Sequence, residues 1–405
     1  MPLTLDRTIL LLIVAVLVAL AARRLRLPYT VGLVVTGLAL ALARISTGAA
    51  LTPEFIFGAI LPPLLFEAAL NIHWTELRCD ALPILTLATL GVVISALVVA
   101  AGMTHLAGWP WPPALLFGIL IAATDPVAVI AMFKDTGVVG RLRLLVEGES
   151  LLNDGVAAVL FVLALSWVES SGAAVTPAGV AQALAWTAGG GILVGLACGG
   201  LALMAAGRTA DHLVETALTT VVAYGSFLLA EHLHVSGVLA TVTAGLVMGN
   251  LGVLREQGQR HTLTDRGRAF VLEFWEFVAF LANSLIFLLI GLRVAAIPFR
   301  ALGVGALIAA ILLVLIGRAL AVYPLCLPFF RSRRAVPLRE QHILVWGGLR
   351  GALALALCLS LPRALLFRDE IVIATFGVVA FSVVVQGLTM PWLLRRLALL
   401  PRTPK

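Results

Sequence analysis

A succession of apolar segments along the whole chain is the feature that most limits the folds open to this sequence. A helix that crosses a bilayer needs about 20 predominantly apolar residues, and by this criterion we divide the chain into thirteen segments. They lie near residues 8-22, 28-43, 54-71, 81-108, 112-133, 144-168, 177-206, 212-230, 235-252, 268-292, 299-325, 340-361 and 370-394. In lipid, every backbone N–H and C=O must be bonded within the protein, which restricts spanning structures to helices and closed barrels. The pattern predicts an all-α polytopic membrane protein with thirteen transmembrane helices, a single membrane unit over 1-405 without a soluble domain.

The composition supports lipid as the solvent and excludes several classes of function. Hydrophobic residues make up 61% of the chain and charged residues only 12%, too apolar for a soluble domain that keeps a polar exterior. The net charge of +7 does not indicate nucleic-acid binding, because the basic residues form short clusters between apolar runs with no aromatic interleaving. The four cysteines are scattered without metal-binding spacing, so we expect neither a zinc site nor a disulfide framework, and no cofactor.

The basic residues also predict the orientation of the chain in the membrane. The first apolar run is followed by arginines rather than by a small-residue cleavage site, so we expect it to remain as the first helix. Of the 28 Lys and Arg residues, placing the N-terminus outside leaves 20 on the cytoplasmic side. Six then lie outside and two within spans: Arg7, Arg44, Arg293, Arg300, Arg363 and Arg368, and Arg318 and Arg350. We therefore expect an inner (plasma) membrane protein with its C-terminus in the cytoplasm.

Two of the predicted spans are interrupted in their interiors. The fifth carries Thr124-Asp125-Pro126, and the twelfth carries Gly347-Gly348-Leu349-Arg350-Gly351. The two interruptions occupy corresponding places if segments 1 to 6 and 8 to 13 form two six-helix repeats, and the odd offset of seven would make the second repeat inverted. Paired interrupted helices in inverted repeats point to a binding site near the middle of the membrane in transporters.

Ionisable residues inside spans mark the candidate site. Each costs about 2.5 to 3.5 kcal/mol on insertion scales and is usually partnered or functional. Five lie centrally: Glu67, Asp125, Glu149, Asp154 and Arg350.

The sixth segment carries two polar stripes. Ser150 and Asp154 are four residues apart and share one helix face, and Glu149 and Asn153 form a neighbouring stripe. We assign Asp154 and Ser150 to an ion site, because a carboxylate and a hydroxyl supply the hard oxygen ligands for which Na⁺ and a proton can compete. We assign Glu149 to structure; the alternative for all four residues is helix packing alone.

The two interruptions predict the remaining contacts of the site. Pro126 lacks an N–H and biases Asp125 away from helical geometry, so the fifth span should open near Thr124 and turn free carbonyls towards a cation. The alternative is a simple proline kink. An unpaired guanidinium at Arg350 would be very unfavourable, so we expect a structural salt bridge to Glu149.

Two further groups have less definite assignments. For Glu67, contact with the same cavity and a place near the cytoplasmic end are equally consistent with the sequence. We interpret Asn283 and Ser284 as polar contacts between helices.

The motifs that contain these residues resemble a known family. ATDPVAV (123-129), EGESLLNDG (147-155), NSLIFLLIGL (283-292) and GGLRGALALAL (347-357) are together similar to the NhaP/NHE-type sodium/proton antiporters of the monovalent cation:proton antiporter superfamily. The resemblance covers essentially the whole chain.

The resemblance implies a fold and a role for each matched residue. It implies a homodimer, with dimerisation helices in 1-80 plus 177-292 and a six-helix core in 81-170 plus 299-396, crossed by two unwound helices. The matched residues would be Asp154 as the ion- and proton-binding carboxylate, Asn153 as its partner, Asp125 with Thr124 at the crossing, Ser150 and Glu67 as further cation ligands, and Glu149 paired with Arg350. Asn153 before Asp154 is similar to the electroneutral branch, which exchanges one cation for one proton.

The function expected from the sequence is thus exchange of Na⁺ or Li⁺ for H⁺ by alternating access, serving pH homeostasis, with K⁺/H⁺ exchange as the alternative within the fold. Competition of cation and proton for one carboxylate couples their fluxes in opposite directions. An intramembrane hydrolase that uses Ser150 is disfavoured because no suitably placed His or Lys base accompanies it. An anion carrier is disfavoured by the several carboxylates, and a channel would differ in its single-channel currents.

Overall fold

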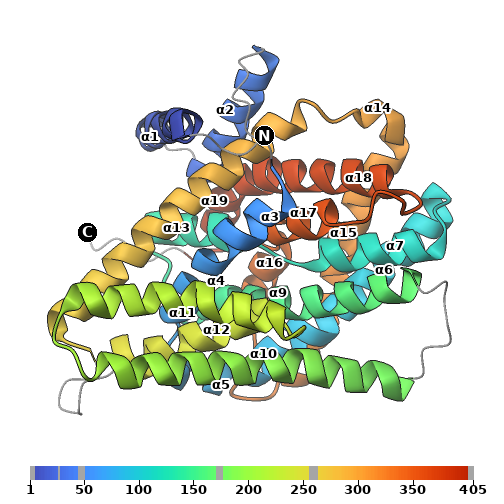
Figure 1. Ribbon diagram of the computed structural model, residues 1–405. Helices are drawn as coiled ribbons and strands as arrows, with labels where there is room; N and C mark the ends of the chain where they lie inside the picture. The colour runs from blue at the N-terminus through green and yellow to red at the C-terminus, as the bar shows by residue number, and fades with distance from the viewer. Residues whose placement is uncertain (1–4, 26–27, 44–50, 170–176, 255–262, 400–405) are drawn as a thin grey trace. The chain divides into compact units, whose positions relative to one another are not determined.

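The described part of the chain is built of helices. The computed structural model describes residues 5–25, 28–43, 51–169, 177–254 and 263–399, and within these ranges no residue is in a β-strand (Figure 1). The all-α class predicted from the apolar segments is confirmed. Several basic residues used for the orientation, among them Arg44, Arg255 and Arg260, lie outside the described residues, and the orientation stays a prediction.

The helices follow the apolar segments along the sequence. Those of the first half are α1 (Leu5–Leu25), α2 (Tyr29–Leu42), α3 (Pro53–Phe55), η1 (Ile56–Ile60), α4 (Leu61–Leu70), α5 (Trp74–Thr86), η2 (Leu87–Gly91), α6 (Val92–Ala107), α7 (Trp111–Ala122), α8 (Val127–Thr136), α9 (Arg141–Glu169) and α10 (Pro177–Ala206). Those of the second half are α11 (His212–His232), α12 (Gly237–Met248), η3 (Gly249–Val253), α13 (Asp265–Val294), α14 (Phe299–Leu302), α15 (Val304–Cys326), η4 (Leu327–Phe329), α16 (Leu338–Trp346), α17 (Ala352–Leu359), α18 (Arg368–Phe381), η5 (Ser382–Gln386) and α19 (Gly387–Arg396).

Many of these helices have the length and composition of membrane spans. Among the described residues, eight helical stretches are long and apolar enough to cross a bilayer, and four shorter apolar helices accompany them. Helix α9 corresponds to the predicted segment 144-168, and α13 corresponds to 268-292. The predicted number of thirteen crossings and the inverted repeats remain predictions.

Both predicted interruptions are present. The fifth segment divides into α7 and α8, with residues 123–126 outside helical structure, and the twelfth divides into α16 and α17 around residues 347–351. Pro126 ends the hydrogen-bond ladder of the fifth segment because it has no N–H to donate. In the twelfth, three glycines among five residues lower the cost of leaving helical geometry.

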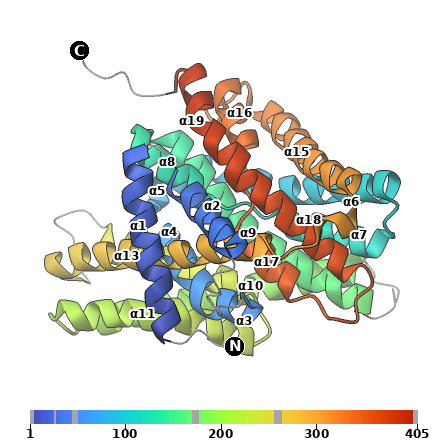
Figure 2. The same cartoon turned by 90° about the horizontal axis from the view of Figure 1, so that it is seen from above.

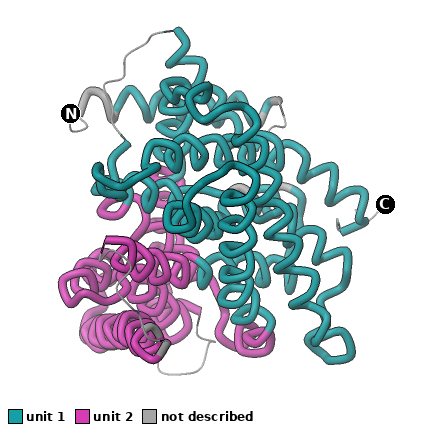
Figure 3. Tube along the Cα trace, turned by 90° about the vertical axis from the view of Figure 1, so that its right-hand side faces the viewer, with its two compact units in different colours: residues 1–56, 83–153, 283–405 teal, residues 57–82, 154–282 magenta. Residues whose placement is uncertain are grey.

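The helices form two compact units (Figure 3). Unit 1 comprises residues 1–56, 83–153 and 283–405, and unit 2 comprises residues 57–82 and 154–282. These boundaries differ from the predicted division into dimerisation and core helices, most clearly because 1–56 belongs with the two interrupted segments in unit 1. The functional division itself stays a prediction.

Small residues bring the helices of unit 1 into close contact. Figure 2 shows α15 beside α6, where Ser95 Oγ donates a hydrogen bond to the backbone carbonyl of Gly317 over 3.2 Å. A Cβ at Gly118 of α7 would overlap the carbonyl of Ala96 in α6. Elsewhere in unit 1, Ser284 contacts Tyr29 of α2 through a hydroxyl–hydroxyl hydrogen bond of 2.6 Å, a polar contact between helices as expected.

Unit 2 is organised in the same way. Helices α10, α11 and α12 lie side by side (Figure 1), and α12 also packs on α4. Glycines of α10 allow the close approach, since a Cβ at Gly195 would overlap the carbonyl of Ala240 in α12. An aromatic pair fills the neighbouring core, with the rings of Phe66 and Trp275 centred 4.7 Å apart, and Trp275 Nε1 donates to Thr219 Oγ1 over 2.9 Å.

Candidate functional site at the two broken helices

The two interruptions lie against each other within unit 1. The backbone N–H of Asp125, in the break between α7 and α8, donates to the carbonyl of Leu349, in the break between α16 and α17, over 2.7 Å. Four helix ends therefore meet at one place: the C-terminal ends of α7 and α16 and the N-terminal ends of α8 and α17. Each of these ends carries backbone groups that lack intrahelical partners.

Asp125 occupies the meeting point of the two N-terminal ends. Its Oδ1 accepts from the N–H of Val127, the first residue of α8, over 2.9 Å, and its Oδ2 accepts from the N–H of Ala352, the first residue of α17, over 3.4 Å. A carboxylate is favourable here because helix N-termini carry partial positive charge. Glycine is required at position 351, since a Cβ there would overlap the Asp125 carboxylate. The sequence-based placement of Asp125 at the break agrees with this geometry.

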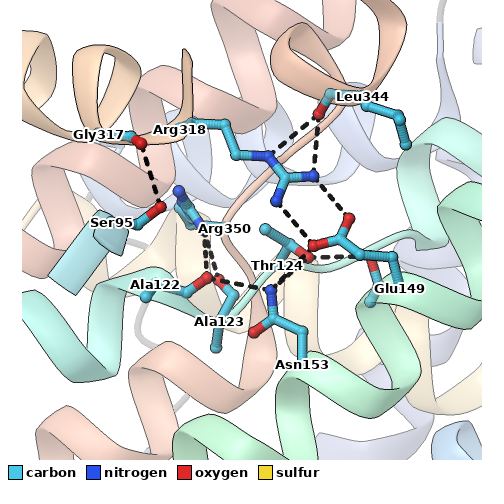
Figure 4. A network of polar contacts seen from close by, with 11 residues as sticks. Ser95, Ala122, Ala123, Thr124, Glu149, Asn153, Gly317, Arg318, Leu344 and Arg350 are labelled. Carbon is cyan, nitrogen blue, oxygen red and sulfur yellow. Dashed lines mark hydrogen bonds and ion pairs between the residues drawn. The ribbon is translucent and has the colours of Figure 1, made fainter. Parts of the chain in front are cut away.

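Arg350 binds the backbone carbonyls at the C-terminal end of α7. Its guanidinium Nη1 donates to the carbonyl of Ala122 over 2.7 Å and to the carbonyl of Ala123 over 3.0 Å (Figure 4). The side chain is only 2% exposed, and its Nε lacks a hydrogen-bond partner among the described residues. The fifth span opens as expected, but these two carbonyls accept hydrogen bonds from Arg350 rather than facing a cation.

The predicted salt bridge between Glu149 and Arg350 is wrong. Glu149 instead binds Arg318 of α15 through two parallel hydrogen bonds, from Nη1 to Oε1 over 2.7 Å and from Nη2 to Oε2 over 2.6 Å (Figure 4). The same guanidinium donates to the carbonyl of Leu344 near the C-terminal end of α16, from Nε over 3.1 Å and from Nη2 over 3.0 Å. The fork of Arg318 matches both carboxylate oxygens, whereas Arg350 is engaged by the carbonyls of α7.

The sequence analysis does not identify Arg318 as part of the site. It places Arg318 within a span and names no partner for it, although a buried arginine in an apolar helix implies one. The side chain is 4% exposed and Glu149 is 1% exposed, so the pair is buried from both sides. The structural role predicted for Glu149 is retained with a different partner.

A cluster of uncharged polar groups lies beside the ion pair. Thr124 Oγ1 and Ser150 Oγ are 2.9 Å apart and share a hydrogen bond. The amide Nδ2 of Asn153 lies 3.3 Å from each of three acceptors, the carbonyl of Ala122, Thr124 Oγ1 and Glu149 Oε1 (Figure 4). Its Oδ1 is buried and accepts no hydrogen bond from the described residues. The structure thus brings together three of the predicted ion-site residues: Thr124, Ser150 and Asn153.

Two further predicted ligands belong to unit 2. Asp154 follows Asn153 on α9, one helical turn after Ser150, and is 9% exposed. Glu67 of α4 is half-buried, and Asn71 Nδ2 donates to its Oε1 over 3.0 Å and to its backbone carbonyl over 2.9 Å. The ion-binding roles of Asp154 and Glu67 remain predictions.

The chemistry of the cluster is that of hard oxygen donors. Hydroxyl groups of Thr124 and Ser150, the free amide oxygen of Asn153 and the carboxylate of Asp125 are ligands suited to small hard cations. Within the described residues, no three His, Cys, Asp or Glu side chains gather as a metal cluster.

Comparison with known proteins gives consistent matches. The family described as sodium/hydrogen exchanger, transmembrane, matches residues 9–396. The chain is 41% identical over 380 residues to the Na(+)/H(+) antiporter ApNhaP of Aphanothece halophytica, covering 93% of this chain and 70% of that protein. It is 35% identical over 404 residues to the Na(+)/H(+) antiporter NhaH of Halobacillus aidingensis, covering 96% and 97%. The solved structure of the sodium proton antiporter MjNhaP1 from Methanocaldococcus jannaschii at pH 8 has the same fold, with a TM-score of 0.74 at 21% identity, covering 96% of this chain and 97% of that one.

Proposed function

The chain belongs to the sodium/hydrogen exchanger family, as its four motifs suggested, and on this premise we propose that it exchanges Na⁺ or Li⁺ for H⁺ across a membrane. The observation that carries the proposal is the cluster of buried oxygen donors at the meeting of two broken helices. Irregular backbone at membrane depth is tolerated only against protein or a water-filled cavity, and transporters place ion sites at such interrupted helices.

The proposed exchange depends on competition for one carboxylate. Asp154 is largely buried on α9, and a carboxylate charge within a membrane span is costly. A proton or a Na⁺ ion neutralises it, and Ser150, one turn earlier, offers a hydroxyl ligand to the cation. If only the neutralised forms change between inward-facing and outward-facing states, the protein carries one proton in one direction for each Na⁺ that it carries in the other.

The stoichiometry follows from the residue beside this carboxylate. Asn153 is uncharged, and its amide donates to groups of the broken helix and to Glu149. Glu149 is already bound by Arg318. The Asp125 carboxylate accepts hydrogen bonds at two helix N-termini, so we propose that it keeps its charge throughout and that Asp154 alone exchanges a cation for a proton. Exchange is then electroneutral, one cation for one proton, and the transport rate should not respond to membrane voltage.

The remaining features of the proposal come from the family and from the basic residues. We place the protein in the inner (plasma) membrane with its N-terminus outside, working by alternating access as a homodimer. K⁺/H⁺ exchange by the same site is the alternative. Oxygen ligands bind either ion, and selectivity between the two ions depends chiefly on the size of the cavity.

Proton flux in proteoliposomes tests the proposal. An outward-directed gradient of Na⁺, Li⁺ or K⁺ is imposed in turn, and the internal pH is followed with a fluorescent dye at several pH values. Wild type should respond to Na⁺ and Li⁺, and Asp154→Asn should abolish the response, because the amide cannot bind a proton reversibly. Asp265→Asn is the matched control, since the side chain of Asp265 is 84% exposed at the start of α13.

Three results would contradict the proposal. Wild-type protein that moves no protons under a Na⁺ or Li⁺ gradient would remove the Na⁺/H⁺ assignment, and a response to K⁺ alone would replace it with the alternative. Equal activity of Asp154→Asn and Asp265→Asn would show that Asp154 is not the shared carboxylate.

A further inference from the structure

The final span contains a short π-helical segment that faces the second broken helix. Residues Ser382–Gln386 form η5 between α18 and α19. Figure 2 labels the two flanking helices in red. A π-helical turn adds one residue to the helix and redirects the side chains around it, and such turns often occur at functional sites. No motif of the predicted ion site includes this segment.

Ser382 and Gln386, the first and last residues of η5, bind the two edges of the break between α16 and α17. Gln386 Nε2 donates to the carbonyl of Trp346, the last residue of α16, over 2.9 Å. Ser382 Oγ accepts from the N–H of Arg350, just before α17, over 3.1 Å, and donates to the carbonyl of Val379 in its own span over 2.9 Å.

Both side chains are buried, and a third contact reinforces the first. Ser382 is 1% exposed and Gln386 is 2% exposed, so water does not replace these bonds readily. In α19, Thr389 Oγ1 accepts from the indole Nε1 of Trp346 over 2.8 Å. The final span thus binds Trp346, directly before the break, and Arg350, near the end of the break.

We propose that Ser382 and Gln386 form a clasp that positions the broken helix and thereby sets the affinity of the site for its cation. The clasp acts through Leu349 and Arg350: Leu349 accepts the N–H of Asp125, and Arg350 binds the carbonyls that precede Thr124. Displacement of the break moves both Asp125 and the Thr124 hydroxyl. Because ligand geometry must hold within about 0.5 Å for productive binding, loss of the clasp weakens cation binding without removing a ligand.

The inference rests on the proposed cation exchange, so the test has a transport readout and a readout independent of transport. Ser382→Ala removes the hydroxyl, and Gln386→Met keeps the length of the side chain but removes the amide. Thr216→Ala is the control, because Thr216 of α11 is buried and its hydroxyl donates within its own helix, to His212, over 2.8 Å.

In proteoliposomes, we expect either variant to raise the KM for Na⁺ by about threefold to tenfold, the effect of one lost hydrogen bond. The maximal rate should stay within about twofold of wild type, since no ligand is lost. Thr216→Ala should change neither quantity. An unchanged KM in both clasp variants, or an equal rise in Thr216→Ala, would overturn the inference.

Hydrogen exchange at the backbone N–H of Arg350 separates the clasp from the transport assignment. Ser382→Ala should speed its exchange by about tenfold relative to wild type, because that N–H loses its acceptor, while Thr216→Ala should not. If the wild-type protein shows no cation-driven proton flux, the proposed function is refuted. The hydrogen-exchange measurement would still decide whether the clasp exists. Unchanged exchange in Ser382→Ala would show that it does not.

Discussion

The ion pair between Glu149 and Arg318 gives the sharpest prediction about the stability of the site. Glu149→Gln leaves the Arg318 guanidinium buried without its carboxylate, and removal of one partner of such a pair costs about 3 to 5 kcal/mol. Arg318→Met leaves the carboxylate unpaired and also deprives the Leu344 carbonyl of two donors, which adds about 1 to 3 kcal/mol. We therefore expect Arg318→Met to be the more destabilising single change.

The double variant should be more stable than the sum of the single effects predicts. With both charges removed, the remaining loss is mainly that of the bonds to Leu344, about 1 to 3 kcal/mol, so the coupling energy should be at least about 3 kcal/mol. The free energy of unfolding in mixed micelles, followed by tryptophan fluorescence, measures each corner of the cycle.

A second cycle supplies the control. Glu149→Gln combined with Arg350→Met should show a coupling energy less than half as large, because the donors of Arg350 go to the carbonyls of Ala122 and Ala123. A coupling energy for Glu149 and Arg350 equal to or above that for Glu149 and Arg318 would refute the assignment of partners.

Three further predictions follow from single side chains. Asp125→Asn should reduce Na⁺-driven proton flux at least about tenfold and lower the free energy of unfolding by about 1 to 2 kcal/mol, because a charge facing two helix N-termini is lost; flux assays and unfolding check it. Gly351→Ala should abolish flux or folding since its Cβ overlaps the Asp125 carboxylate, whereas Gly200→Ala, which meets no atom within 4 Å, should behave as wild type in the same assays. Glu215→Ala should destabilise unit 2 by about 1 to 3 kcal/mol in equilibrium unfolding, because the N–H and the hydroxyl of Thr264 each lose an acceptor at 2.9 Å; an unchanged midpoint would contradict it.

The apolar pattern was sufficient to predict the all-α class and the positions of the long helices. Long runs such as 144-168 have one structural solution in lipid, and α9 occupies Arg141–Glu169. Pro126 and the glycines of 347–351 act through local backbone geometry, so the two breaks were also predictable. The helical spacing of Ser150 and Asp154 likewise required no knowledge of the tertiary structure.

The partner of Glu149 was not predictable in the same way. Arg318 and Arg350 are both single arginines in apolar surroundings, and Glu149 lies 169 residues from the one that binds it. Which guanidinium reaches the carboxylate depends on how α15 packs beside α9 and α16, a tertiary property that residue spacing does not encode. The contacts of Ser382 and Gln386 were missed for a related reason, since short polar residues in a membrane span carry no signal of their partner.

The four charged residues at the crossing compensate the partial charges at the ends of the broken helices. Asp125 faces the N-terminal ends of α8 and α17, where helix dipoles are positive, and Arg350 and Arg318 face the C-terminal ends of α7 and α16, where they are negative. Glu149 balances the second arginine, so these side chains carry no net charge between them. The helix ends at the crossing are thus compensated by protein charges, and in the proposed mechanism the charge that changes during transport is that of Asp154 and its bound ion.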